Sequence, residues 1–447
     1  MPPRFLPLPI RKHRGPLFWI RPANLWAGRR HWRPDHSNEW RYEHLRNAVA
    51  PRPPVEFPSD PSERTRPYQW LLDRPLNDGF SFIILGDTGE GDASQYALLP
   101  LIRALKPDFM IINGDIAYPA GNPEDYLAGF FEVYRNLRIP VWAVPGNHEY
   151  YSKGKGREFF DVFCSPVSAA TWEEHGLASK PQPGSYWELA ERDVPLVILG
   201  VDSGQSGALD GKPGRLGIGK RRPDVQQHAW LERRLLLAER RGAKVIVLFH
   251  IPKLVDARAQ KIALDQVHMS LSRYSCVQLV VTAHIHNLQI YDVGTFGRFL
   301  RDVTKTAPVS RARYMVSGGG GAYIGSTAFT GPYMPQSYPD PKRFSELARA
   351  GQEIVAKLRV AKTLPGDLIA NLGRHALASD GDQMRMVSLI HCECRRAGIR
   401  ITPYYFDDLA ALYPNLANGS PVSIEMGVPP LTPQAVSLCR VNPSFDL

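Results

Sequence analysis

Six short apolar runs, rich in β-branched residues, constrain the fold of this chain more than any other feature. They read FSFIILGD, DFMIINGD, VWAVPGNH, VPLVILGVD, KVIVLFH and VQLVVTAHIH, and all lie between residues 80 and 286. Amphipathic stretches separate several of them; in QHAWLERRLLLAERR, for example, Leu231, Leu235 and Ala238 follow helical spacing. Continuous apolar strands that alternate with helices predict an α/β fold with buried, largely parallel strands.

Five of the six runs end in residues that can bind a metal ion. These residues are Asp87, Asp115, Asn147 with His148, His250, and His284 with His286. The functional crevice of an open α/β sheet lies at the carboxyl ends of its strands, so we expect these side chains to converge. A single Asp or Asn at a strand end is commonly a turn or helix cap, but five such ends together favour a shared site.

The residue types in this set suit a particular class of ion. Asp, Asn and His without a thiolate favour borderline to hard ions such as Zn, Mn or Fe. The seven candidates exceed the needs of one ion. Two ions about 3.5 to 4 Å apart that share a carboxylate are the usual arrangement for hydrolysing phosphate esters, because they bind phosphoryl oxygens and acidify a water. A neighbouring His can then protonate the leaving oxygen.

The ordered segments resemble a known family, the calcineurin-like metallophosphoesterases, in the purple acid phosphatase version. The matching segments are GDTG at 86–89, GDIAY at 114–118, GNHE at 146–149, VLFH at 247–250 and AHIH at 283–286. Gly89 stands where the general superfamily has a His, and Tyr118 is the purple acid phosphatase replacement for it. Ala283 stands where family members normally have Gly; both residues are small, so we expect little effect on the ligands.

The resemblance implies a central β-sandwich flanked by helices and a dinuclear metal site. The residues matched to the ligands of the first metal are Asp87, Asp115, Tyr118 and His286. Those matched to the ligands of the second are Asp115, Asn147, His250 and His284, so that Asp115 would bridge. His148 would contact the phosphate and assist the leaving group. A tyrosinate ligand suggests ferric iron at the first position, with Zn, Mn or Fe at the second.

The activity that the resemblance implies is hydrolysis of a phosphate ester by in-line attack of a metal-bound hydroxide. A phosphorylated substrate follows, but its identity does not; we favour a monoester. The alternative is a phosphodiesterase for cyclic nucleotides or nucleic acid. A non-catalytic scaffold that retains the fold is less favoured, because every motif residue is present. His228 and His268 are candidates for additional substrate contacts.

Composition and charge divide the chain further. We expect a basic Pro/Trp-rich N-terminal arm and linker at 1–75, a catalytic domain at 76–335, and at 336–447 a helical insertion plus terminal strands that complete or cover the sheet. Residues 1–50 hold ten Lys or Arg against three Asp or Glu, and this surplus of seven positive charges is most of the formal net charge of +10. The arm could contact an anionic membrane surface or a nucleic acid. We favour an arm that packs its tryptophans on the domain and leaves its arginines solvated.

Several smaller motifs have structural interpretations. The segment 383–406 predicts two strands joined by a tight turn near Ala397 and Gly398. HCECRR, at 391–396, lacks a second ligand pair, so we interpret its cysteines as strand residues. SGGGGAY, at 317–323, lacks the Lys-Ser/Thr of a P-loop and predicts a crowded loop beside the metal site. Asp202 would either support the site or cap its strand.

The sequence also bears on localisation. No apolar run approaches the roughly 18 residues that a spanning helix needs, so we expect no transmembrane segment. The N-terminal residues lack the continuous apolar region of a secretory signal. The five cysteines are an odd, scattered number, which is typical of reduced thiols. We therefore expect a cytoplasmic protein.

Overall fold

The computed structural model describes most of the predicted catalytic domain and the C-terminal strands. The described residues are 79–322, 336–338, 387–405 and 433–447, apart from gaps at 90, 92, 153, 155, 166–167, 192–193, 204–224, 253–264, 439 and 442–443. The predicted arm at 1–75 and the predicted helical insertion lie outside these residues. The proposed division of the chain into three parts therefore stays a prediction.

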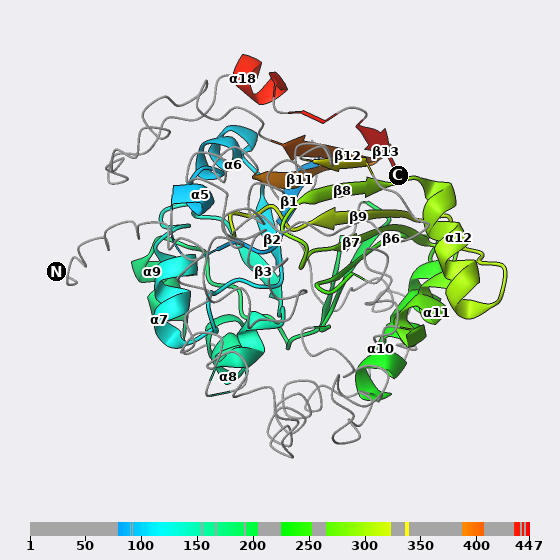
Figure 1. The fold of residues 1–447 in the computed structure, drawn as a ribbon, viewed down its shortest axis with the longest axis horizontal. Helices are drawn as coiled ribbons and strands as arrows, with labels where there is room; N and C mark the ends of the chain where they lie inside the picture. The colour runs from blue at the N-terminus through cyan, green and yellow to red at the C-terminus, as the bar shows by residue number, and fades with distance from the viewer. Residues whose placement is uncertain are drawn as a thin grey trace, which may run out of the picture.

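The first of two sheets has six strands in the order β13-β12-β11-β1-β2-β3 (Figure 1). Its strands are β1 (Phe80–Leu85), β2 (Phe109–Asn113), β3 (Val141–Val144), β11 (Ser388–Arg395), β12 (Gly398–Tyr405) and β13 (Phe445–Asp446). Strands β1, β2 and β3 are parallel, as predicted, whereas β11 pairs antiparallel with β1. Since Arg395 pairs with Gly398, the predicted hairpin is present, and it extends the sheet beside β1.

The second sheet has seven strands in the order β10-β8-β9-β7-β6-β5-β4. Its strands are β4 (Trp187–Ala190), β5 (Leu196–Val201), β6 (Lys244–Phe249), β7 (Val277–Thr282), β8 (Leu288–Tyr291), β9 (Arg313–Ser317) and β10 (Gln336–Tyr338). Strands β5, β6, β7 and β9 are parallel. The predicted parallel strands therefore form, divided between the two sheets.

The two sheets pack face to face and form the expected β-sandwich. A buried cluster between them takes Phe82 and Phe109 from the first sheet and Leu248 and Leu279 from the second. The rings of Phe82 and Phe109 stack with centroids 4.8 Å apart. Cys392 belongs to the same cluster, and Cys394 is equally buried in β11, so both cysteines are structural strand residues as predicted.

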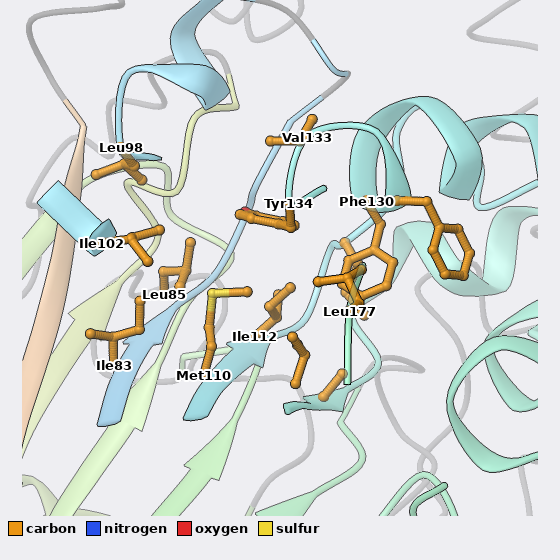
Figure 2. Packing of buried hydrophobic residues seen from close by; sticks show 14 of the residues in the cluster. Ile83, Leu85, Leu98, Ile102, Met110, Ile112, Phe130, Val133, Tyr134 and Leu177 are labelled. Carbon is orange, nitrogen blue, oxygen red and sulfur yellow. The ribbon is translucent and has the colours of Figure 1, made fainter. Parts of the chain in front are cut away.

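Helices cover the outer faces of the sandwich (Figure 1). On the side of the first sheet lie α5 (Ala93–Tyr96), α6 (Leu99–Leu105), α7 (Pro123–Tyr126), α8 (Arg157–Phe159), α9 (Ala169–Glu174), a 3₁₀ helix (His148–Tyr151) and two π-helical turns (Leu127–Phe131 and Phe160–Cys164). Figure 2 shows Ile83 and Met110 of the strands in one buried cluster with Ile102 and Phe130, and these side chains together exclude water from this face.

The second sheet is covered by α10 (Val225–Arg240), α11 (Asp265–Arg273) and α12 (Val293–Thr304), whereas α18 (Pro433–Leu438) lies near the C-terminal strands (Figure 1). The predicted apolar face of α10 is correct: Leu231, Leu235 and Ala238 are buried in one cluster with Val245 and Val247 of β6. Within the described part of the chain, no helix has the length and apolarity that a membrane span would need.

Candidate metal centre

The five strand ends singled out in the sequence meet at one edge of the sandwich. Asp87, Asp115 and Asn147 follow β1, β2 and β3 of the first sheet, whereas His250 follows β6 and His284 follows β7 of the second. His250 Nε2 lies 3.2 Å from Asp115 Oδ2, and His284 Nδ1 lies 3.3 Å from His250 Nε2. The candidate site is therefore built across both sheets, at the carboxyl ends of their parallel strands.

Three of these residues adopt a backbone conformation that is rare for side chains other than glycine. The φ angles are 56° at Asp87, 51° at Asp115 and 67° at His284. A left-handed residue at a strand end turns the chain sharply, and such strain is retained only where surrounding contacts impose it. Here Asp87 Oδ2 accepts a 2.7 Å hydrogen bond from the backbone N–H of His284, which ties the first motif to the last.

The glycines beside the candidate ligands allow the two sheets to approach closely. A Cβ atom at Gly114 would lie 2.4 Å from Nδ1 of His250, and one at Gly146 would lie 2.1 Å from Oδ1 of Asp115. Both distances are far below van der Waals contact. The Gly-Asp and Gly-Asn pairs in the motifs thus have a steric cause, because any larger residue would displace a candidate ligand.

Asp115 belongs to two groups of side chains that could each hold a metal ion. In one group, the carboxylate of Asp115 lies beside the carboxylate of Asp87 and a ring nitrogen of His286. In the other, it lies beside ring nitrogens of His250 and His284. The ligand atoms within each group are at most 4.8 Å apart. We call these the first and second ligand groups. One shared carboxylate between two groups is the geometry of a dinuclear centre.

Tyr118 lies at the centre of the first ligand group. Its hydroxyl is 3.2 Å from Asp87 Oδ1, 3.1 Å from Asp115 Oδ2 and 3.2 Å from Nε2 of His286. The side chain of Tyr118 is fully buried. A phenol oxygen surrounded by two carboxylates and an imidazole fits coordination to a cation, which would relieve the crowding of these acceptors.

Asn147 provides a further sign that the second group fits a metal ion. Its Oδ1 atom is buried and has no hydrogen-bond partner among the described residues. A buried polar atom without a partner costs free energy, of the order of 1–3 kcal/mol. A cation bound beside Asn147 would supply that partner.

The charges in the site are strongly coupled. Burial raises the pKa of Asp115, but the neighbouring His250 and His148 more than offset this, so the pKa is lowered overall. Burial lowers the pKa of His250, yet Asp115 and Asp87 outweigh it and raise that pKa to about 9. For His284, burial and the charge on His250 lower the pKa to about 4. The carboxylates thus favour positive charge at the place where a metal ion would bind.

The comparisons with known proteins agree with this geometry. Residues 80–288 match the family model of the calcineurin-like phosphoesterases. Residues 80–288 form a calcineurin-like phosphoesterase domain. None of the curated proteins matches the chain in sequence.

The chain is also similar to solved structures. A purple acid phosphatase from yellow lupin (Lupinus luteus) seeds is 11% identical with a TM-score of 0.45; the match covers 73% of this chain and 51% of the lupin chain. A dimetal phosphatase from Danio rerio is 16% identical with a TM-score of 0.36, over 55% of this chain and 89% of that one. The chain thus spans about half the length of the lupin structure.

His148 of the phosphoesterase domain lies beside the shared carboxylate without belonging to either ligand group. Its backbone N–H donates to Asp115 Oδ1 at 2.9 Å, and its Nδ1 lies 2.7 Å from the carbonyl oxygen of Pro119. Because a carbonyl oxygen only accepts, Nδ1 carries a proton. The other ring nitrogen, Nε2, lies on the side of Asp115, 3.9 Å from Oδ2. Burial lowers the pKa of His148. The side chain remains 14% exposed, which leaves it reachable from solvent.

Two supporting residues were not predicted. The carbonyl oxygen of Asn113 lies 2.9 Å from Nδ1 of His250, so this ring nitrogen donates and the Nε2 lone pair faces the site. Glu149 is fully buried and accepts four backbone hydrogen bonds, from Asp115, Ile116, Ala117 and Gly146. Burial and the nearby Asp115 raise the pKa of Glu149 to about 7. Glu149 is the last residue of the GNHE segment and Asn113 directly precedes GDIAY, and these positions are the signal that could have identified them.

Asp202 supports the 3₁₀ helix that begins at His148. Its Oδ2 accepts a 2.5 Å hydrogen bond from the hydroxyl of Tyr150, and its backbone N–H donates to Gln227 Oε1 at 2.7 Å. Of the two interpretations of Asp202, support of the site is therefore correct, and it acts through Tyr150.

The glycine run supports the first motif rather than forming a phosphate cradle. The N–H of Gly320 donates to the carbonyl oxygen of Gly86, and the N–H of Ala322 donates to that of Asp87, both at 2.9 Å. The N–H of Gly318 donates to Asn287. Since these donors are already used, the predicted crowded loop is confirmed for 317–322; Tyr323 lies outside the described residues.

The two additional histidines proposed as substrate contacts lie elsewhere. His268 is fully buried, and its ring packs against those of Phe249 and Phe299 beneath the second sheet. His228 lies on α10, where its Nε2 is 3.2 Å from Ser270 Oγ on α11. For His268, complete burial among aromatic rings rules out contact with a substrate.

Proposed function

We propose that the chain is a dinuclear metal-dependent phosphoesterase that prefers phosphate monoesters. The observation that carries this proposal is the position of Asp115, whose carboxylate belongs to both ligand groups. A carboxylate shared in this way would hold two ions close enough to act on one phosphoryl group. The preference for a monoester follows from the resemblance of the motif set, Tyr118 included, to that of purple acid phosphatases.

The ligands divide between the two positions as the resemblance implies. Asp87, Asp115, Tyr118 and His286 would hold the first ion, and Asp115, Asn147, His250 and His284 the second. A phenolate favours a hard trivalent ion, so we assign iron to the first position and Zn, Mn or Fe to the second. When bound, the two ions supply Lewis acidity that binds phosphoryl oxygens and acidifies a water molecule.

His148 acts on the substrate rather than on the ions. Its ring is fixed by Pro119 on one side and lies against the ring of Tyr118, with centroids 4.2 Å apart, on the other. Nε2 is therefore aimed at the space beside Asp115, where a phosphoryl group would lie. From there His148, in the form protonated on both ring nitrogens, contacts the phosphate and transfers its Nε2 proton to the leaving oxygen, while Nδ1 keeps its proton on the carbonyl oxygen of Pro119.

The competing function is a phosphodiesterase for cyclic nucleotides or nucleic acid, which would use the same ligands. The two differ in the group that must leave and in the charge of the substrate. A scaffold without activity would bind ions and turn over neither class of ester.

Hydrolysis of p-nitrophenyl phosphate beside its bis-ester tests the proposal, with protein loaded with Fe and Zn, or with Mn. The matched blank is the Asp115→Asn variant, measured in parallel. We expect release of nitrophenol from the monoester by the wild type and none above background by the variant. A faster reaction with the bis-ester would establish the diesterase, and no reaction with either, with two ions bound, would contradict an enzymatic function.

A further inference from the structure

The amide of Asn147 poses a problem of orientation. An asparagine side chain has an oxygen that can bind a cation and an NH₂ group that cannot, and the two exchange places when the terminal torsion rotates by about 180°. Only one of the two orientations gives a ligand. Something in the protein must therefore select the orientation in which Oδ1 faces the second ligand group.

Tyr151 makes the contact that selects it. The Nδ2 atom of Asn147 donates a 2.9 Å hydrogen bond to the hydroxyl of Tyr151, while Oδ1 is buried with no protein partner among the described residues. A phenol oxygen accepts such a bond and still donates its own proton elsewhere. With the NH₂ group held by Tyr151, the oxygen is left at the other end of the amide without a hydrogen bond from the described residues, available to a bound ion.

The position of Tyr151 is itself fixed by its surroundings. It closes the 3₁₀ helix His148–Tyr151, which Tyr150 anchors to Asp202 at 2.5 Å. The ring of Tyr151 packs against the ring of His148 with centroids 4.9 Å apart. Tyr150 thus ties the helix to Asp202 at the end of β5, and Tyr151 contacts the candidate ligand Asn147 and the candidate acid His148.

We propose that Tyr151 is a positioning residue that orients the amide of Asn147 and so sets the affinity of the second ligand group for its metal ion. The proposal rests on the dinuclear site proposed above and adds to it a residue outside the five motifs. Tyr151 belongs to neither ligand group. Its influence passes through one hydrogen bond, which a single substitution can remove.

The substitution Tyr151→Phe removes the hydroxyl and keeps the ring against His148. We expect the weaker of two metal-binding steps to lose affinity about 10- to 100-fold, as when hydrogen-bond partners of metal ligands are removed, and the tighter step to be unchanged. Stepwise titration of metal-free protein with Co²⁺ or Zn²⁺ against a competing chelator measures both. Tyr126→Phe is the control, because the buried hydroxyl of Tyr126 has no partner among the described residues.

A second substitution separates orientation from general support. A carboxylate presents an oxygen whichever way it turns, so an aspartate at position 147 needs no partner to orient it. In an Asn147→Asp background, Tyr151→Phe should therefore weaken the second metal-binding step by less than about threefold, as for two substitutions that do not interact. An equal loss in both backgrounds, an equal loss in both binding steps, or no loss at all would overturn the proposal. If the wild type binds two ions but hydrolyses no ester, the function proposed above fails and this inference stands; if it binds only one, both fail.

Discussion

The two ligand groups that share Asp115 differ in how their side chains are held. In the first group, Asp87, Asp115, Tyr118 and His286 contact one another directly and none is more than 6% exposed. In the second, His284 is partly exposed, as is Asn147, which we assign to the same ion. Residues outside the group orient its side chains: Tyr151 holds the Asn147 amide and Asn113 holds the His250 ring.

This difference predicts two unequal metal positions. The first group is closed and self-supporting, so it should hold its ion tightly. The second opens to solvent beside His148, so it should bind its ion more weakly and face the incoming substrate. Four substitutions test this contrast, taken here from the largest expected effect to the smallest.

Asp115→Asn should affect both positions at once. The substitution removes the charge that the two groups share, so we expect loss of at least one bound ion and a fall in phosphoester hydrolysis on the order of 10³ or more, as for lost electrostatic stabilisation of a transition state. Elemental analysis of the dialysed protein and a hydrolysis assay measure the two effects. Full metal content in a folded variant would show that Asp115 does not bridge.

His148→Ala should affect neither position but should slow the reaction. We expect kcat to fall by about 10² to 10⁴, the range for loss of a general acid, with metal content near that of the wild type. Steady-state kinetics together with elemental analysis check this result. Normal turnover would remove the role assigned to His148.

Tyr118→Phe should affect the first position alone. If this tyrosine is a phenolate ligand of ferric iron, the iron-loaded protein absorbs visible light and the variant loses that band while His250 and His284 keep the second ion. Absorption spectra of the two proteins at equal iron content make the comparison. A colourless wild type that is active would instead indicate two divalent ions.

Glu149→Gln should produce the smallest effect, on stability more than on chemistry. The carboxylate accepts four backbone hydrogen bonds, and an amide would direct its own N–H groups at some of those donors. We expect a loss of about 1–3 kcal/mol in the free energy of unfolding, measured by urea denaturation of the metal-free protein. An unchanged free energy of unfolding would show that these four hydrogen bonds do not stabilise the site.

The sequence predicted the parts of this contrast that depend on strand ends. The apolar runs indicated the strands, and the polar residues that close them indicated Asp87, Asp115, Asn147, His250 and His284, which the structure brings together. The hairpin near Ala397 was also predicted, since two apolar segments flank a tight turn.

What the sequence did not show depends on contacts between distant parts of the chain. Glu149 is hydrogen-bonded to backbone groups up to 34 positions away, and Asn113 holds a ring 137 positions away. Neither contact leaves a periodic pattern. The guess at His268 was wrong because isolated histidines carry no sign of whether their surroundings are aromatic core or open site. The division of the parallel strands between two sheets followed from the family resemblance, not from the strand pattern.

The central claim is that Asp115 joins two metal positions. Electron paramagnetic resonance of the Mn²⁺-loaded protein tests it most directly, with the metal content measured on the same sample. We predict two ions per chain with the exchange-coupled spectrum of ions that share a carboxylate, about 3.5 to 4 Å apart. One ion per chain, or two with the spectrum of isolated Mn²⁺, would contradict a bridging Asp115 and the dinuclear site built on it.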